Sequence, residues 1–121
     1  MLEKEFQNRF LKKLRKRGLF YKIWGGGYQE SGIPDILGCY KGFFIGIELK
    51  TNKGKVSELQ KYQLKRIIDN KGFSLILRPN NEQDIWNLLD YIDNLMKDRD
   101  YQVGFNGENY IEFRSGNENI I

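Results

Sequence analysis

The chain has 121 residues, of which 40% are hydrophobic, and a formal net charge of +4; this length predicts a single domain, 1–121, with a modest core. It contains no histidine and one cysteine, Cys39, which excludes internal disulfides, zinc sites of thiolates or imidazoles, and nucleophiles activated by histidine. No apolar run reaches the roughly twenty residues of a membrane span, and residues 1–5 lack the apolar segment of a secretory signal, so we expect a cytoplasmic protein in which Cys39 is a small buried residue.

Apolar spacing and turn residues predict the elements of the chain. In chain order these are a helix at 3–17, strands at 19–24, 33–40 and 43–51, a helix from 57 to about 70, a strand at 73–78, a helix at about 82–97, and a terminal hairpin of 101–105 and 110–114. The first helix is predicted from Phe6, Phe10 and Leu14, which recur every four residues, and Gly18 is expected to end it. Lys41–Gly42 and Asn106–Gly107 are expected to be the two hairpin turns.

The second helix begins with a capping box, in which Ser57 is followed by Gln60. We expect this helix to bury Leu64, Ile67 and Ile68. The strand at 73–78 is almost continuously apolar, which is typical of an interior strand parallel to its neighbour. The order of elements predicts an α/β fold with a mixed central sheet flanked by helices, in which a core of about 3–79 is followed by the terminal helix and hairpin of about 82–114.

Two carboxylates and one amine are brought together by the expected register. If Lys41 and Gly42 are the central residues of their turn, Asp35 lies opposite Glu48 across two neighbouring strands. Opposed Cβ atoms are about 4.5–5.5 Å apart, and Lys50, two residues beyond Glu48, shares their face of the sheet. A register shift of one residue would destroy this arrangement.

Such a pair of carboxylates favours a divalent metal, because the two negative charges otherwise repel each other. Oxygen ligands without histidine or thiolate favour Mg²⁺ or Mn²⁺, and we expect Asp35, Glu48 and the backbone carbonyl of Leu49 to bind it. The metal would polarise a phosphodiester and acidify the attacking water. Lys50 would orient or deprotonate that water, or neutralise the charge on the phosphate; the sequence leaves these roles open.

At this point the chain resembles the PD-(D/E)xK nuclease superfamily, and within it the stand-alone VRR-NUC domains of phages and bacteria. The matching segments are residues 31–38, which contain Gly-Ile-Pro-Asp, residues 44–51, which contain Glu-Leu-Lys, and residues 54–60. The resemblance covers about residues 3–79. It implies a restriction-endonuclease-like αβββαβ core, Mg²⁺ or Mn²⁺, and hydrolysis of phosphodiester bonds in DNA by a site containing Asp35, Glu48 and Lys50.

The resemblance implies further site residues and partners. It assigns a glutamate in the first helix, for which we choose Glu3 over Glu5 as a catalytic and metal-binding residue, and a glutamine after the site, which Gln60 matches. Glu3 is equally a helix-start acid favoured by the helix dipole, and Gln60 equally a capping residue. Single-domain members resemble Holliday-junction resolvases, which implies branched or structured DNA as substrate, a homodimer, and a bacterial or phage-infected cell.

The positive charge lies in the part of the chain that carries the site. Residues 1–79 hold 17 Lys and Arg against 7 Asp and Glu, whereas residues 80–121 hold 3 against 9. A basic region next to the site favours contacts with DNA phosphates, for which the candidates are Lys12, Lys16, Lys53, Lys55, Gly26 and Gly27. Alternatively, these lysines are ordinary solvated surface residues and the two glycines belong to a plain flexible loop. Trp24 would either stack on an exposed base or pack in the core or on the surface of the sheet.

Two other functions remain open from the sequence. The chain would be a non-catalytic module that binds structured DNA, or a protein-interaction domain that docks through the acidic region 80–121.

Overall fold

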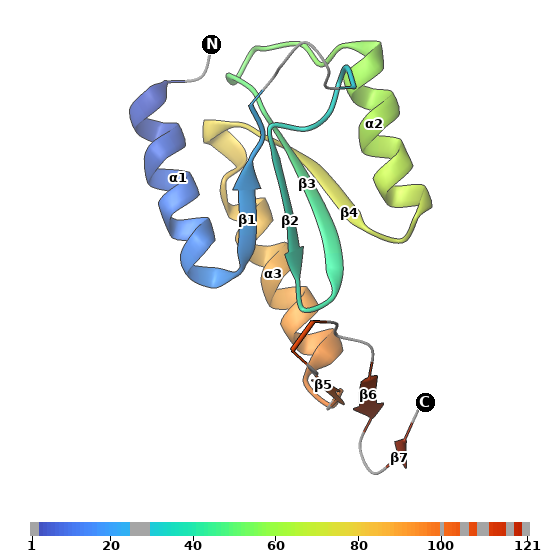
Figure 1. Cartoon of the computed structure of the whole chain (residues 1–121). Coiled ribbons are helices and arrows are strands. Elements are labelled where there is room, and N and C mark those ends of the chain that lie inside the picture. The colour runs from blue at the N-terminus through green and yellow to red at the C-terminus, as the bar shows by residue number, and fades with distance from the viewer. Residues whose placement is uncertain are drawn as a thin grey trace.

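The computed structural model describes residues 3–24, 30–99, 101–104, 107–108, 112–115 and 118–119. Its elements, shown in Figure 1, are α1 (Lys4–Arg17), β1 (Leu19–Lys22), β2 (Ile36–Tyr40), β3 (Phe43–Leu49), α2 (Glu58–Asp69), β4 (Phe73–Leu77), a 3₁₀ turn η1 (Pro79–Asn81), α3 (Gln83–Met96), β5 (Tyr101–Gly104), β6 (Glu112–Ser115) and β7 (Glu118–Asn119). The chain therefore has an α/β fold, and the order of α1 to α3 follows the prediction.

The main sheet is mixed, with strand order β1-β2-β3-β4. β1 and β3 pair with β2 in antiparallel fashion, and β4 pairs with β3 in parallel. The parallel pairing was expected, but the prediction of an interior strand is wrong, because β4 ends the sheet that the described residues form. Its apolar sequence has another cause: α2 and α3 both contact β4, so this edge strand packs against helices as well as its neighbour.

The turn between β2 and β3 sets the register of the site. Lys41 (φ 48°) and Gly42 (φ 93°) both have left-handed backbone conformations, as a type I′ hairpin turn requires. The ladder pairs Ile36 with Ile47 and Leu37 with Gly46. Asp35 lies one position before the first residue of β2. The register continues there towards Glu48, as predicted from the sequence.

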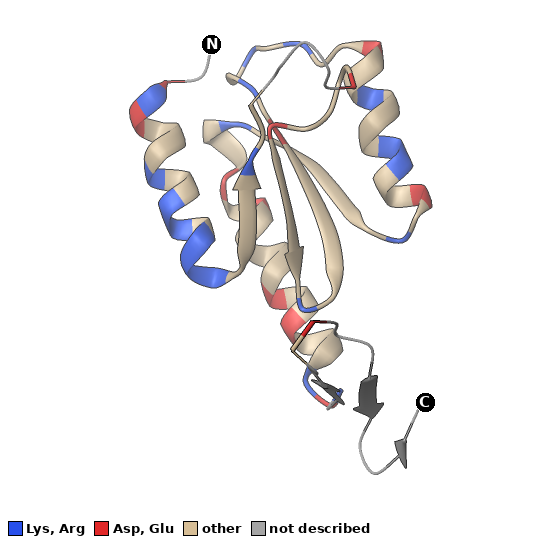
Figure 2. Ribbon diagram, in the orientation of Figure 1, with Lys and Arg blue, Asp and Glu red and all other residues tan. Residues whose placement is uncertain are grey.

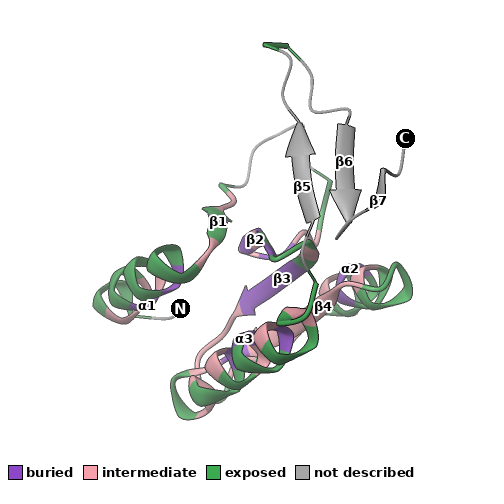
Figure 3. Cartoon of the chain, turned by 90° about the horizontal axis from the view of Figure 1, so that it is seen from below, coloured by how far each residue is buried: buried purple, intermediate pink, exposed green. Residues whose placement is uncertain are grey.

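The core lies between the sheet and the two helices α1 and α3. Its fully buried side chains come from all of these elements, and they are Phe10, Leu14, Ile36, Ile45, Ile47, Leu77, Ile85, Leu89 and Ile92. Figure 3 shows the buried residues on the inward sides of the helices and along β3. The predicted apolar spacing of α1 is thus confirmed at Phe10 and Leu14, which are fully buried.

The other face of the sheet is only partly covered, because α2 packs against β3 and β4. Two predictions are wrong here. Ile68 is 48% exposed, since Leu64 and Ile67 already occupy the inward side of α2 and Ile68 lies one step further round the helix. Cys39 is exposed, as are Leu19 and Phe44, its partners in the ladder, because α2 does not extend over this end of β1 and β2.

Ion pairs join the basic first helix to the acidic third helix (Figure 2). Glu82 accepts hydrogen bonds from Arg9 (3.2 Å) and Lys13 (3.3 Å). At the other end, Asp93 pairs with Arg17 (3.3 Å) and Lys41 (2.7 Å). Three of the nine acids in region 80–121, Glu82, Asp90 and Asp93, are therefore paired within the molecule, which leaves fewer charges for the proposed docking face.

The terminal hairpin was predicted correctly in its pairing and wrongly in its turn. β5 pairs with β6 in antiparallel fashion, with Tyr101 opposite Ser115 and Gly104 opposite Glu112. The paired strands are therefore separated by more residues than the four, 106–109, that the predicted strands leave between them; Asn106 lies outside the described residues. The short strand β7, which pairs with β6, was not predicted, because its two residues, Glu118 and Asn119, are polar and form no apolar pattern.

Candidate functional site

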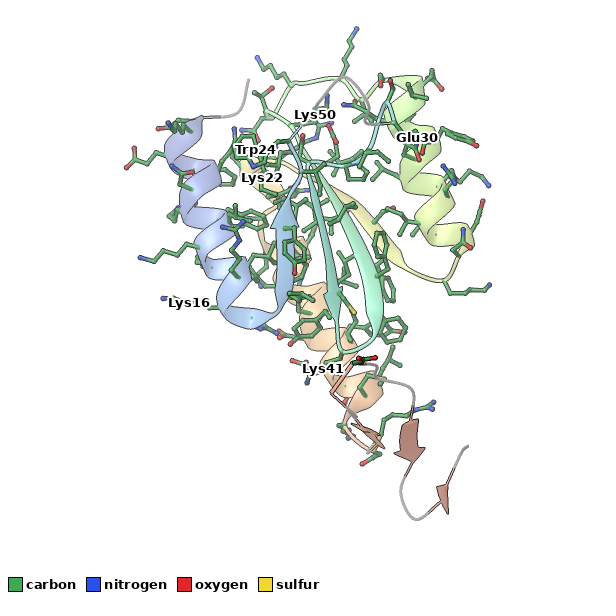
Figure 4. The ribbon with its side chains drawn as sticks, viewed as in Figure 1. Lys16, Lys22, Trp24, Glu30, Lys41 and Lys50 are labelled. Carbon is green, nitrogen blue, oxygen red and sulfur yellow. The ribbon has the colours of Figure 1, made fainter. Side chains whose placement is uncertain are left out.

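A cleft of about 760 Å³ lies where the N-terminal part of α1 meets the ends of β1, β2 and β3. Asp35, Glu48 and Lys50 all line it, so the structure brings together the three residues that the sequence singled out. The opposite wall carries Lys4, Gln7 and Asn8 of α1, and Lys22 and Trp24 of β1 and the segment after it complete the rim. Figure 4 shows Lys22, Trp24 and Lys50 close together in this part of the molecule.

Asp35 is fixed between two strands. Its Oδ2 accepts a hydrogen bond from the Leu49 backbone N–H at 2.9 Å, and its own carbonyl accepts one from the Ile23 N–H at 2.7 Å. The preceding Gly32 has φ +81°, and its α-carbon lies so close to α2 that a Cβ would be 2.8 Å from the Leu59 carbonyl oxygen. The path of residues 32–35 is therefore set by β1, β3 and the first turn of α2 together.

Glu48 is the buried carboxylate of the cleft, with 3% of its surface exposed. Its Oε2 accepts a hydrogen bond from Gln60 Nε2 at 2.7 Å and lies 3.8 Å from Lys50 Nζ, but Oε1 is buried and has no hydrogen-bond partner among the described residues. Burial, together with the negative charge of Asp35, raises the pKa of Glu48 to about 7. A buried oxygen without a donor is costly, and a bound cation would satisfy it.

Gln60 completes the cap of α2 and also contacts the candidate site. Its Oε1 accepts the Ser57 backbone N–H at 2.9 Å, while Ser57 Oγ accepts the Gln60 N–H at 3.1 Å, which completes the capping box of α2. Its Nε2 at the same time donates to Glu48. The cap holds the amide in place, so that the start of α2 orients the buried carboxylate.

Two lysines flank the acid pair. Lys50 Nζ lies 3.8 Å from Glu48 Oε2, and Lys22 Nζ lies 3.9 Å from Asp35 Oδ1; their side chains are 21% and 18% exposed. Lys22 was not among the site residues predicted from the sequence. The signal was present in the register, because Lys22 pairs with Ile36, the neighbour of Asp35, but the end of the first strand was not assigned a partner.

The predicted phosphate-binding lysines lie around the cleft. Lys53 and Lys55 are exposed on a loop that Arg78 holds, since its Nη1 donates to the carbonyls of Thr51 and Gly54, each at 2.7 Å. Lys12 and Lys16 line a shallow groove of about 330 Å³ on α1, which shares Asn8 and Leu11 with the cleft. Gly26 and Gly27 lie outside the described residues.

Glu3 does not line the cleft. It is exposed at the start of α1, where its side chain makes no capping hydrogen bond and its carbonyl accepts the Gln7 N–H at 3.1 Å. Glu5, the alternative, is also exposed in the first helical turn. The α1 side chains that do line the cleft are those of Lys4, Gln7, Asn8 and Leu11, so the geometry adds no support for the first-helix acid.

The donor set of the cleft fits a hard divalent cation in part. Over the described part of the chain, no three Asp, Glu, His or Cys side chains gather into a metal site; Asp35 and Glu48 supply two carboxylates. The orphaned Glu48 Oε1 is the observation that favours a cation, because its position is buried and negatively charged. Mg²⁺ is commonly held by one or two carboxylates, with water and substrate phosphate completing its coordination.

Two comparisons with known proteins found no match. No protein-family model matches the chain, and no curated protein matches it. Within the described segments, none of the helices has the length and apolar character needed to cross a membrane.

Proposed function

We propose that this protein is a Mg²⁺- or Mn²⁺-dependent endonuclease that hydrolyses phosphodiester bonds in branched or structured DNA, such as Holliday junctions. The observation that carries the proposal is the cleft in which the buried, unpartnered Glu48 Oε1 lies beside Asp35 and Lys50. A pKa near 7 and a specific charge partner in a cleft are features of functional carboxylates. A merely structural pair of acids would not be expected to retain an unpaired oxygen.

The fold supports the same proposal. Residues 4–77 have the element order α-β-β-β-α-β, which is the order that the resemblance to PD-(D/E)xK nucleases implies. Asp35 lies just before β2, Glu48 is on β3, and Lys50 directly follows β3. The ladder set by the turn at Lys41–Gly42 starts with Ile36 opposite Ile47, and its register extends to Asp35 and Glu48. We therefore assign a restriction-endonuclease-like core, as part of the proposal.

In this function the protein residues position the substrate and hold charge. Asp35, Glu48 and the Leu49 carbonyl would bind the cation, which when bound polarises the phosphodiester and lowers the pKa of a water molecule. Gln60 keeps Glu48 oriented through the 2.7 Å hydrogen bond. Lys50 Nζ, which has a fixed place beside Glu48, orients the attacking water or neutralises the charge that develops on the phosphate.

The test is cleavage of four-way junction, flap, nicked and plain duplex DNA by the purified protein, with Mg²⁺, with Mn²⁺ and with EDTA. We expect metal-dependent cleavage of branched substrates by the wild type and its loss in Asp35→Asn and Glu48→Gln. Glu58→Gln is the matched control, because Glu58 is an exposed acid at the start of α2 whose only ion pair among the described residues is with Lys61. Full metal-dependent cleavage by both site variants would refute the assignment.

Calorimetry separates the enzyme from a non-catalytic DNA-binding module. The proposal expects uptake of Mg²⁺ or Mn²⁺ by the wild type and none by Asp35→Asn. A non-catalytic module would bind junctions without metal and leave every substrate intact.

The homodimer is part of the proposal, because symmetric cleavage of a four-way junction needs two sites. Sedimentation equilibrium with and without junction DNA measures the stoichiometry. A protein that stays monomeric on the junction would limit the activity to single cuts.

A further inference from the structure

Trp24 is the large hydrophobic residue with the greatest exposure among those described, at 79%. Tryptophan is usually well buried, and here neither the core nor the ladder of β1 uses the indole, because β1 ends at Lys22. The side chain instead lines the cleft that holds Asp35 and Glu48. Figure 4 shows Trp24 next to Lys22 and Lys50. The core alternative raised from the sequence is therefore excluded.

Lys22 joins this indole to the acid pair. Its Nζ lies 5.5 Å from the centre of the Trp24 ring and 3.9 Å from Asp35 Oδ1. A cation at this distance from a ring is in the range of cation–π attraction. The flat apolar surface, the ammonium group and the carboxylates thus follow one another along the same wall of the cleft.

A nucleotide has the chemistry to match this sequence of groups. Nucleobases stack on exposed aromatic side chains whatever their sequence, and a flanking phosphate would pair with Lys22. A base inside a continuous duplex has both faces covered by its neighbours, so it can offer a face to Trp24 only after it leaves the stack. The surface therefore selects for an unpaired base rather than for a base sequence.

We propose that Trp24 and Lys22 form a stacking platform that binds an unpaired nucleobase next to the phosphate that the cation at Asp35 and Glu48 would hold. This inference rests on the proposed nuclease function and narrows its substrate class. DNA with unpaired nucleotides at the cut, as in a flap, a gap or an opened junction centre, is preferred to continuous duplex. The same DNA strand would run along the cleft wall formed by Lys4, Gln7 and Asn8 of α1.

A binding experiment in EDTA tests the platform without requiring cleavage. A short single-stranded oligodeoxynucleotide is titrated into wild type, Trp24→Ala, Trp24→Phe and Tyr62→Ala. Tyr62 is the matched control, because it is an exposed aromatic residue under a cation, with Arg66 at 5.7 Å from its ring centre, and it lies outside the cleft. Loss of one stacked base predicts affinity about tenfold lower in Trp24→Ala, and no change in Tyr62→Ala.

Tryptophan fluorescence reports the contact directly. The chain has two tryptophans, and Trp86 packs against Phe10 and donates to Glu82. Single-stranded DNA is therefore expected to quench the wild-type signal, and to leave the signal of Trp24→Phe, which comes from Trp86, unchanged. The Phe ring still stacks, so this variant keeps more affinity than Trp24→Ala.

Cleavage then tests the substrate class. Two substrates share the sequence around the cut, and only one has unpaired nucleotides there; Trp24→Ala is expected to lower the wild type's preference for that substrate about tenfold. The platform is overturned if Trp24→Ala binds single strands as well as Tyr62→Ala does, or if it weakens cleavage of both substrates equally. Failure of the wild type to cleave any DNA refutes the nuclease proposal instead, and the binding series still decides whether the platform exists.

Discussion

Glu48 has a buried position that is unfavourable for a charge as long as no cation is bound. It is 3% exposed, one of its oxygens has no donor among the described residues, and Asp35 adds a second negative charge. Lys50 lowers its pKa and Gln60 donates to it, but the pKa still rises to about 7. Binding of the proposed cation would favour the ionised form of Glu48 and would therefore be coupled to release of its proton.

The raised pKa of Glu48 predicts a pH-dependent difference between wild type and Glu48→Gln in EDTA. The folded protein keeps a proton that the unfolded chain releases above about pH 4.5, so the wild type loses stability as pH rises towards and through 7. The neutral variant escapes this loss. Between pH 5 and pH 8, the free energy of unfolding of Glu48→Gln relative to wild type should increase by roughly 2 kcal/mol, as measured by urea denaturation.

Glu82→Gln is the control for this experiment. Burial raises the pKa of Glu82, but hydrogen bonds from Trp86, Arg9 and Lys13 outweigh it and lower the pKa overall. Its contribution to stability is therefore present above its unfolded pKa and is lost only in acid, so the relative stability of this variant should stay constant from pH 5 to pH 8. A flat profile for Glu48→Gln as well would contradict the raised pKa of Glu48 in the folded protein.

Gln60 allows its two roles to be separated by comparison with Ser57. Ser57→Ala removes one bond of the capping box and Gln60→Ala removes the other, so each should lower the free energy of unfolding by about 1 kcal/mol. Only Gln60→Ala also removes the donor to Glu48 Oε2. We expect its metal affinity and cleavage rate to fall about 10- to 100-fold, while Ser57→Ala, assayed where it is fully folded, keeps both. Equal cleavage rates would show that Gln60 is only a cap.

At the scale of elements, the close contact between α2 and the segment that leads into β2 depends on Gly32. Its φ of +81° is unfavourable for other residues, and a Cβ would be 2.8 Å from the Leu59 carbonyl oxygen. Gly107 has a similar φ of +101°, but a Cβ there would meet nothing within 4 Å. The two glycines share the backbone conformation and differ in the contact.

Gly32→Ala should therefore lower the free energy of unfolding by more than Gly107→Ala does. Backbone strain alone is expected to cost about 1–2 kcal/mol at either position, and the collision with Leu59 adds to it only at position 32. Urea denaturation of both variants measures the difference. Because residues 32–35 carry Asp35, Gly32→Ala should also weaken Mg²⁺ binding in the folded protein, and equal losses of stability would mean that the loop can move away from α2.

The same scale explains which features were predictable from the sequence. The helix α1, the capping box of α2 and the turn at Lys41–Gly42 are encoded by residues close together in the chain, and with them the register that opposes Asp35 and Glu48. Features that depend on which surface a distant element covers were not predictable. The exposure of Cys39 and Ile68, the edge position of β4 and the place of Lys22 beside Asp35 all depend on packing between elements.

At the scale of the whole molecule, the basic residues of α1 divide into two sets. Arg9, Lys13 and Arg17 pair with acids of α3 or just before it. Lys12 and Lys16 have no ion-pair partner among the described residues, and they line the groove that continues the cleft. Internal pairing thus cancels charge on the side of α1 that faces α3 and leaves it on the side next to the candidate site.

This division predicts which lysines set the salt dependence of DNA binding. Each lysine that neutralises a phosphate contributes about 0.9 to the slope of log affinity against log salt on duplex DNA. Lys53→Ala with Lys55→Ala, and separately Lys12→Ala with Lys16→Ala, should each reduce the slope by roughly 2. Lys61→Ala with Lys65→Ala is the matched control, since these exposed lysines of α2 already pair with Glu58 and Asp69 and should leave the slope unchanged. A control pair that reduced the slope as much as the other two would mean that the protein binds DNA through its overall charge, and not through the surface around the cleft.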